Sequence, residues 1–131
     1  MTDYYYYSSF SDGSLISSNL NGNYIYPTNN GFAYSIYETL NSGAVIQRAG
    51  SLHVSFVALA DIPQEMLSMP PDKFGLPNSY FKVNEGCSVN VISGPAVPWF
   101  GQPGGGIQYY LLDGNVQTLI DKGVLIPLGG N

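Results

Sequence analysis

Residues 95–110, with the sequence PAVPWFGQPGGGIQYY, constrain the fold of this 131-residue chain more than any other stretch. The three consecutive glycines at 104–106 lose more backbone freedom on folding than other residues would. A folded domain tolerates them where the backbone adopts conformations that other residues resist, or where it approaches another group closely. Residues 107–112 then have a strand-like composition, and the polar Gln108 lies at the start of this strand. The stretch therefore predicts a tight loop that leads into a strand and presents Gln108 to a cleft.

The charge of the chain limits what it can bind. Four Lys and Arg residues stand against nine Asp and Glu residues, and Arg48 is the only arginine. Nucleic acids and anionic membrane surfaces are bound by clustered Lys and Arg, so we expect neither as a partner. The single cysteine, Cys87, excludes an intrachain disulfide, and no spacing typical of a metal site is found, so we expect no metal.

The length of the chain indicates one domain. Residues 1–27 are rich in Tyr, Ser, Asn and Gly. We expect them to form an irregular segment packed on a domain that spans residues 28–131. The N-terminus has neither the basic start nor the apolar centre of a signal peptide, and no apolar run approaches the roughly 20 residues that span a bilayer.

Strand patterns dominate from residue 44 onward. Apolar segments separated by turn residues predict strands at 44–49, 53–60, 79–83, 87–92, 107–112 and 124–128. The Gly50-Ser51 break indicates a hairpin, and three prolines limit any helix within 61–71 to one or two turns. One C-terminal helix is expected, capped by residues 113–115 and ended at Gly123. The predicted fold is a β-dominated α+β domain: a small twisted antiparallel or mixed sheet, or half-barrel, of about six strands with one helix.

Residues 94–109, GPAVPWFGQPGGGIQY, resemble the signature of the tuberculosis necrotizing toxin (TNT) domain family of NAD(P)+ glycohydrolases. This family includes bacterial toxin domains and fungal surface NADases. The similarity continues through VQTLIDKGVL at 116–125 and covers about residues 28–128. The upstream elements that match are NNGFA at 29–33, QRAG at 47–50 and the Pro70-Pro71 pair.

The resemblance implies that the chain cleaves the bond between nicotinamide and ribose of NAD+ or NADP+, which are substrates, without a cofactor. Carried over by position, the catalytic residues are Gln108, Arg48 and Phe56. They match the family's active-site glutamine, the arginine of its D-R-(F/Y)-G element and the aromatic residue beside the nicotinamide. The resemblance also implies a toxin or effector that is secreted or delivered, with an immunity protein as a possible partner.

The chain shows no convincing pair of carboxylates, which ordinary glycosidases require. Nicotinamide leaves a pyridinium as a neutral molecule and needs no proton, so this absence fits the implied reaction. The enzyme then has to orient the ribose, stabilise an oxocarbenium-like transition state and place a water. A neutral glutamine suits this task because its amide offers one acceptor and two donors.

The loop before the predicted strand at 107–112 could hold the substrate. Phe56 or Trp99 could form a flat wall for the nicotinamide ring, although Trp99 and Phe100 could instead plug the sheet. The backbone N–H groups of Gly104, Gly105 and Gly106 could approach a pyrophosphate. We therefore assign Trp99, Phe100 and the three glycines to substrate binding.

Two positions depart from the family pattern. Gln47 replaces the aspartate of the D-R-(F/Y)-G element, and Leu67 falls where the family has a second arginine. Arg48 could instead form an ion pair with Glu38 or Asp61. A second hypothesis is therefore a catalytically impaired TNT-like domain that binds a nucleotide or a protein partner.

Overall fold

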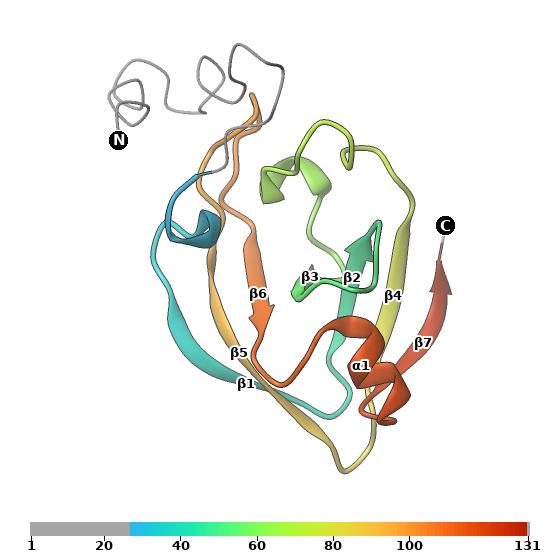
Figure 1. Ribbon diagram of the computed structural model, residues 1–131. Helices are drawn as coiled ribbons and strands as arrows, with labels where there is room; N and C mark the ends of the chain where they lie inside the picture. The colour runs from blue at the N-terminus through green and yellow to red at the C-terminus, as the bar shows by residue number, and fades with distance from the viewer. Residues whose placement is uncertain (1–26, 131) are drawn as a thin grey trace.

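Seven strands form one antiparallel sheet that curls around its core (Figure 1). The computed structural model describes residues 27–130, so the predicted irregular segment falls almost wholly outside the described residues. The strands neighbour one another in the order β1-β5-β6-β3-β2-β4-β7. The bounds are β1 (Ile36–Asn41), β2 (Val45–Ala49), β3 (Phe56–Leu59), β4 (Asn78–Val83), β5 (Ser88–Pro95), β6 (Ile107–Leu111), α1 (Val116–Asp121) and β7 (Leu125–Gly130). The predicted β-dominated α+β fold with one helix is confirmed.

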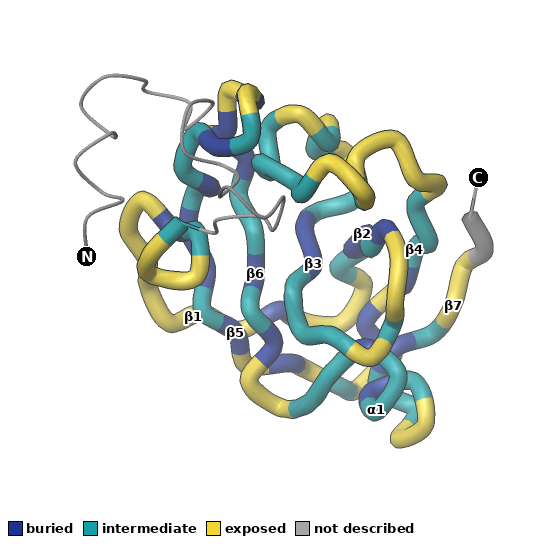
Figure 2. The backbone as a smooth tube through the Cα atoms, turned by 45° about the horizontal axis from the view of Figure 1, so that its top comes forward, coloured by how far each residue is buried: buried dark blue, intermediate teal, exposed yellow. Residues whose placement is uncertain are grey.

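The core lies between the curled sheet and α1, as the buried segments in Figure 2 indicate. Every strand contributes to this core, and in β4, β5 and β6 the buried apolar side chains alternate along the strand, which is the period of a half-buried strand. The fully enclosed members include Ile46, Val83, Val89, Val91 and Leu125. Leu125, at the first position of β7, completes the cluster at the far edge of the sheet.

The helix forms as its sequence predicts. The side chain of Asn115 accepts a hydrogen bond from the backbone N–H of Thr118 at 2.8 Å, which caps the helix N-terminus. Val116 and Leu119 are buried against the sheet. Gly123 follows the helix with φ of 75°, a conformation that favours glycine. No helix within residues 27–130 is long and apolar enough to cross a membrane.

Strand β1 was not predicted, because its sequence carries little of the pattern that marks a strand. Five of its six residues are exposed and only Leu40 is buried. The strand lies at an edge of the sheet, where it pairs with β5 from Ile36↔Ser93 to Asn41↔Ser88. Backbone hydrogen bonds to β5, rather than burial of its side chains, therefore define this strand.

Three connecting segments gather at one end of the sheet (Figure 1): the 3-10 turns η2 (Asn29–Gly31) and η3 (Gln64–Leu67), and the loop of residues 96–106. The glycine run lets two of them meet. The N–H of Gly106 donates to the carbonyl of Met66 at 2.8 Å, and a Cβ on Gly106 would lie 2.9 Å from that same oxygen. The expected close backbone approach at the glycines is confirmed.

Candidate functional site

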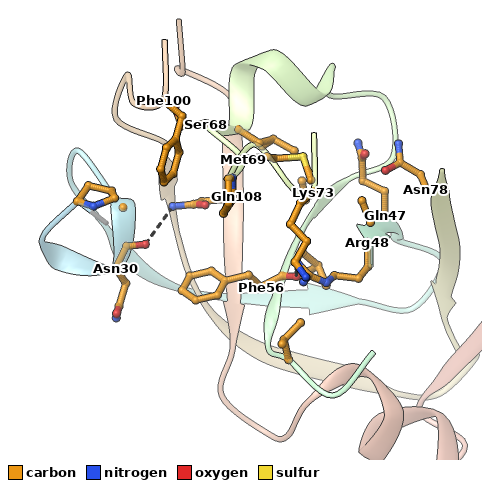
Figure 3. A pocket seen from close by; sticks show the side chains of 18 residues that line it. Asn30, Gln47, Arg48, Phe56, Ser68, Met69, Lys73, Asn78, Phe100 and Gln108 are labelled. Atoms are coloured by element: carbon orange, nitrogen blue, oxygen red, sulfur yellow. Dashed lines mark hydrogen bonds between the residues drawn. The ribbon is translucent and has the colours of Figure 1, made fainter. Parts of the chain in front are cut away.

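A pocket of about 450 Å³ opens where these connecting segments meet the sheet (Figure 3). Its volume is within the range of small-molecule sites. We call one side the sheet wall, which comprises Arg48, Phe56 and Gln108. We call the other side the loop wall, which comprises Leu67, Ser68, Met69, Pro70, Lys73 and Phe100. None of the described residues that line the pocket is Asp or Glu.

The sheet wall brings together the three residues that the sequence nominated as catalytic. They come from β2, β3 and β6, which are adjacent in the sheet. Ala58 of β3 pairs with Gln47 of β2 on one side and with Gln108 of β6 on the other. Strand pairing therefore brings β2 and β6 to the two sides of β3, although Gln47 and Gln108 are about 60 positions apart in the sequence. The catalytic roles of the three residues stay predictions.

Arg48 reaches across the end of β2 toward β3. Its Nε donates to the carbonyl of Ser51 at 3.0 Å, and its Nη1 lies 3.4 Å from the carbonyl of Phe56. Burial lowers the pKa of the guanidinium, which still carries its charge at neutral pH. Among residues 27–130 no carboxylate pairs with it, so neither Glu38 nor Asp61 forms the alternative ion pair. The cation is therefore available to an anionic ligand.

Gln108 is held only loosely. Its Nε2 lies 3.4 Å from the carbonyl of Asn30, longer than an ordinary hydrogen bond. Asn30 belongs to η2 and has a left-handed φ of 53°, which turns its carbonyl toward the glutamine. A Cβ on the following Gly31 would lie 3.4 Å from the same Nε2. The amide thus has one long hydrogen bond within the described residues and keeps hydrogen-bonding capacity for a ligand.

Phe56 is part of an aromatic cluster at the pocket. Its ring packs edge-on against Tyr110, with centroids 5.1 Å apart, and lies 6.5 Å from the ring of Phe32. Such tilted arrangements fix ring orientation. Phe56 is half-buried and lines the pocket, so one ring serves both packing and the pocket surface.

Two buried glutamines hold the loop segments in place. Gln102 accepts from the N–H of Met69 at 2.9 Å and donates to the carbonyl of the same residue at 2.5 Å. Gln47 donates to the carbonyls of Leu59 and Ile62 at 2.6 and 2.7 Å. The two amides therefore fix the beginning and the end of the segment that carries η3.

Phe100 and Trp99 have different positions, although both were assigned to substrate binding. Phe100 lines the pocket and its ring points toward Gln108 (Figure 3). Trp99 is 1% exposed and is not among the lining residues. The turn between Trp99 and Gln102 has positive φ at both central residues, 52° at Phe100 and 74° at Gly101. This turn directs Phe100 into the pocket while the preceding indole is buried.

The glycine run also lies outside the lining residues. Gly104 donates to Glu65 at 3.3 Å, Gly105 to Ala96 at 2.8 Å, and Gly106 to Met66. Each N–H group therefore already has a backbone partner. The structure places the glycines behind the loop wall, where they join its two segments.

Several lining residues were not singled out from the sequence: Asn30, Ser68, Met69, Lys73 and Asn78. Ser68 has a left-handed φ of 50°, and its hydroxyl donates to the carbonyl of Val97. The NNGFA element at 29–33 includes Asn30, and the Pro70-Pro71 pair is the local signal near Ser68, Met69 and Lys73. The side chains that its turn directs into the pocket depend on tertiary contacts.

The single cysteine and histidine lie outside the pocket lining. Cys87 is half-buried and packs against the core, and His53 is exposed. Within residues 27–130, no group of three or more His, Cys, Asp or Glu side chains could hold a metal ion.

Comparisons with known proteins show a family and a shared fold. The profile of the family named tuberculosis necrotizing toxin matches residues 39–128. A conidial surface nicotinamide adenine dinucleotide glycohydrolase of Aspergillus fumigatus is 37% identical over 117 residues, which cover 80% of this chain and 50% of that protein. The chain thus spans about half the length of this relative. A solved structure of Rhs1-CT in complex with its cognate immunity protein RhsI1 is similar to this chain with a TM-score of 0.53 and 21% sequence identity. The match covers 79% of this chain and 83% of that chain, and it shows a shared fold.

Proposed function

The chain belongs to the tuberculosis necrotizing toxin family, and from this membership we propose that it is an NAD+ glycohydrolase. The observation that carries the proposal is the meeting of Arg48, Phe56 and Gln108 on the sheet wall of one pocket. The name of the fungal relative, an NAD glycohydrolase, supports the same activity.

In the proposed reaction, the bond between C1′ of the ribose and the pyridinium nitrogen breaks. Its electron pair stays on the nitrogen, so nicotinamide leaves neutral and requires no general acid. Water adds to C1′ and releases a proton to solvent, which gives ADP-ribose, or its 2′-phosphate when NADP+ is the substrate. A pocket without Asp or Glu among its described lining residues suits this chemistry.

Each residue of the sheet wall has a role in this scheme. Gln108 orients the ribose through its amide and stabilises the charge that develops at C1′. Phe56 gives the nicotinamide ring a flat apolar surface, which attracts its cationic form. Arg48, a half-buried cation without a carboxylate partner among the described residues, binds phosphate oxygens of the dinucleotide.

The test measures hydrolysis of 1,N6-etheno-NAD+ by fluorescence. We expect turnover by the wild type and a drop in kcat of about 100-fold for Gln108→Ala, the effect of losing one transition-state hydrogen bond. Gln117→Ala is the matched control, because that glutamine bonds Asp121 on the exposed face of α1. An inactive wild type, or equal rates for the wild type and Gln108→Ala, contradicts the proposal.

A second candidate is a domain that binds a nucleotide without cleaving it. The observation that favours it is Leu67, which lines the pocket and contributes an apolar side chain rather than a charge. Calorimetric titration with NAD+ and ADP-ribose separates the candidates. Binding of both ligands without hydrolysis supports the second one, and hydrolysis excludes it.

The biological role follows from the family and is likewise a proposal. We propose a toxin or effector domain that is secreted or delivered, and whose pocket is blocked by an immunity protein. The family name and the complex of Rhs1-CT with its cognate immunity protein support this role. Co-expression of a candidate immunity protein should abolish etheno-NAD+ turnover by the wild type.

A further inference from the structure

The positive charges of this acidic chain are unevenly distributed. Of the four Lys and Arg residues, two line the pocket, namely Arg48 and Lys73. The other two, Lys82 and Lys122, are exposed and are not among the lining residues. The chain has nine Asp and Glu residues, yet none of the described ones lines the pocket. The pocket is therefore cationic in a protein of net charge −5.

Both the backbone and the side chain of Lys73 have defined contacts. Its backbone N–H donates to the carbonyl of Pro70 at 2.8 Å, and its own carbonyl accepts from Leu76 at 3.1 Å. Its side chain crosses from the loop wall to the turn after β2 and lies against Gly50. A Cβ built on Gly50 would lie 3.3 Å from Cδ and 3.8 Å from Nζ of Lys73. Glycine at this position thus leaves room for the lysine side chain.

The contact with Gly50 places the Lys73 side chain at the turn that follows β2, two positions after Arg48 in the chain. Figure 3 shows both side chains extending toward the same part of the pocket. Two cations at one place repel each other unless an anion lies between them. The neighbouring lining residues Val54, Leu67 and Pro70 are apolar and cannot compensate the charges.

We infer that Lys73 and Arg48 together form a phosphate-binding subsite, and that Lys73 is its second cation. The identity of the ligand, the pyrophosphate of NAD+, rests on the proposed function. Arg48 presents a planar guanidinium for two phosphate oxygens, and Lys73 adds a compact charge from the opposite wall. The subsite thereby joins the sheet wall to the loop wall through the ligand.

The experiment compares Lys73→Met, Lys73→Arg and the control Lys82→Met. Methionine keeps an unbranched side chain against Gly50 and removes the charge, and Lys82 is an exposed lysine of β4. For Lys73→Met we expect KM for etheno-NAD+ and Kd for ADP-ribose to rise about tenfold, while kcat changes less than twofold. Inhibition by free nicotinamide, which has no phosphate, should not change. Lys73→Arg should restore most of the affinity.

A weaker dependence of the ADP-ribose Kd on salt concentration in Lys73→Met is a further expected result, because one ion pair with phosphate is lost. A merely structural role for Lys73 would alter nicotinamide inhibition and the melting temperature instead.

If the wild type turns over substrate and Lys73→Met has the same KM and Kd, the inference is wrong and the proposed function stands. If the wild type binds ADP-ribose in a Lys73-dependent way without turnover, the subsite stands and the proposed function falls. If the wild type neither turns over NAD+ nor binds ADP-ribose, both fall.

Discussion

The two walls of the pocket are held by different forces. The sheet wall is built on β2, β3 and β6, whose backbones are joined by continuous antiparallel ladders. The loop wall has no ladder behind it. It is held by the two hydrogen bonds of the Gln102 side chain with the backbone of Met69 and by the backbone hydrogen bond from Gly106 to Met66. Most substitutions leave a ladder intact, whereas the loop wall depends on a few particular side chains.

The two walls also differ in their proposed roles, since the loop wall only binds substrate, whereas the sheet wall both binds phosphate through Arg48 and acts on the ribose. In the proposed scheme, the groups that act at C1′ belong to the sheet wall, and the loop wall contributes Lys73 and Phe100 to holding the substrate. Changes that loosen the loop wall should therefore raise KM and lower stability, while kcat is less affected. Changes on the sheet wall, such as Gln108→Ala, should lower kcat in a protein of nearly unchanged stability.

The strongest test of the loop wall is Gly106→Ala. The new Cβ would lie 2.6 Å from Cγ2 of Ile62 and 2.9 Å from the carbonyl oxygen of Met66, so the segments must separate. We expect the free energy of unfolding to fall by about 3 kcal/mol, which is typical of overpacking against backbone. Denaturant unfolding measures this loss, and KM for etheno-NAD+ should rise in parallel.

The neighbouring glycine is the matched control for that change. Gly105→Ala adds a Cβ with nothing within 4 Å, but at a φ of +88°, so only backbone strain is introduced. We expect a loss of about 1 kcal/mol. Equal losses for the two variants would mean that close approach of the segments contributes little to the loop wall.

A smaller effect is expected for Gln102→Leu. This buried glutamine satisfies both backbone groups of Met69, and leucine would leave them unpaired, at a cost of about 2 kcal/mol. Gln117→Leu removes an exposed side-chain bond on α1 and should change stability by less than about 0.5 kcal/mol. Thermal unfolding of both variants distinguishes them. A similar melting temperature for the two would show that water replaces Gln102 at Met69.

The strands with alternating apolar residues could be predicted from the sequence, and β1 could not. Its residues are mostly exposed, and it becomes a strand by pairing with β5, which no local pattern records. The helix could be predicted because its signals are local: the cap at Asn115 and the stop at Gly123.

The candidate site divides in the same way. Arg48, Phe56 and Gln108 followed from a family resemblance, and their strands are neighbours in the sheet. The place of Lys73 in the site could not be predicted, because it depends on the tertiary contact of its side chain with Gly50. Nor could residue type alone distinguish Phe100 from Trp99, since the backbone conformation of one turn decides which ring enters the pocket.

The conformation of Phe100 gives the smallest and most specific of the expected effects. A φ of 52° is unfavourable for phenylalanine by about 1 kcal/mol or more, whereas asparagine adopts this region readily. Phe100→Ala and Phe100→Asn both remove the ring from the loop wall, so both should raise KM by a similar factor. The Asn variant should nevertheless be more stable than the Ala variant by about 1 kcal/mol, because only alanine retains the backbone strain. Denaturant unfolding measures the difference. Equal stability of the two variants would mean that the turn relaxes once the ring is removed, so that contacts of the ring, rather than the backbone, hold Phe100 in the left-handed conformation.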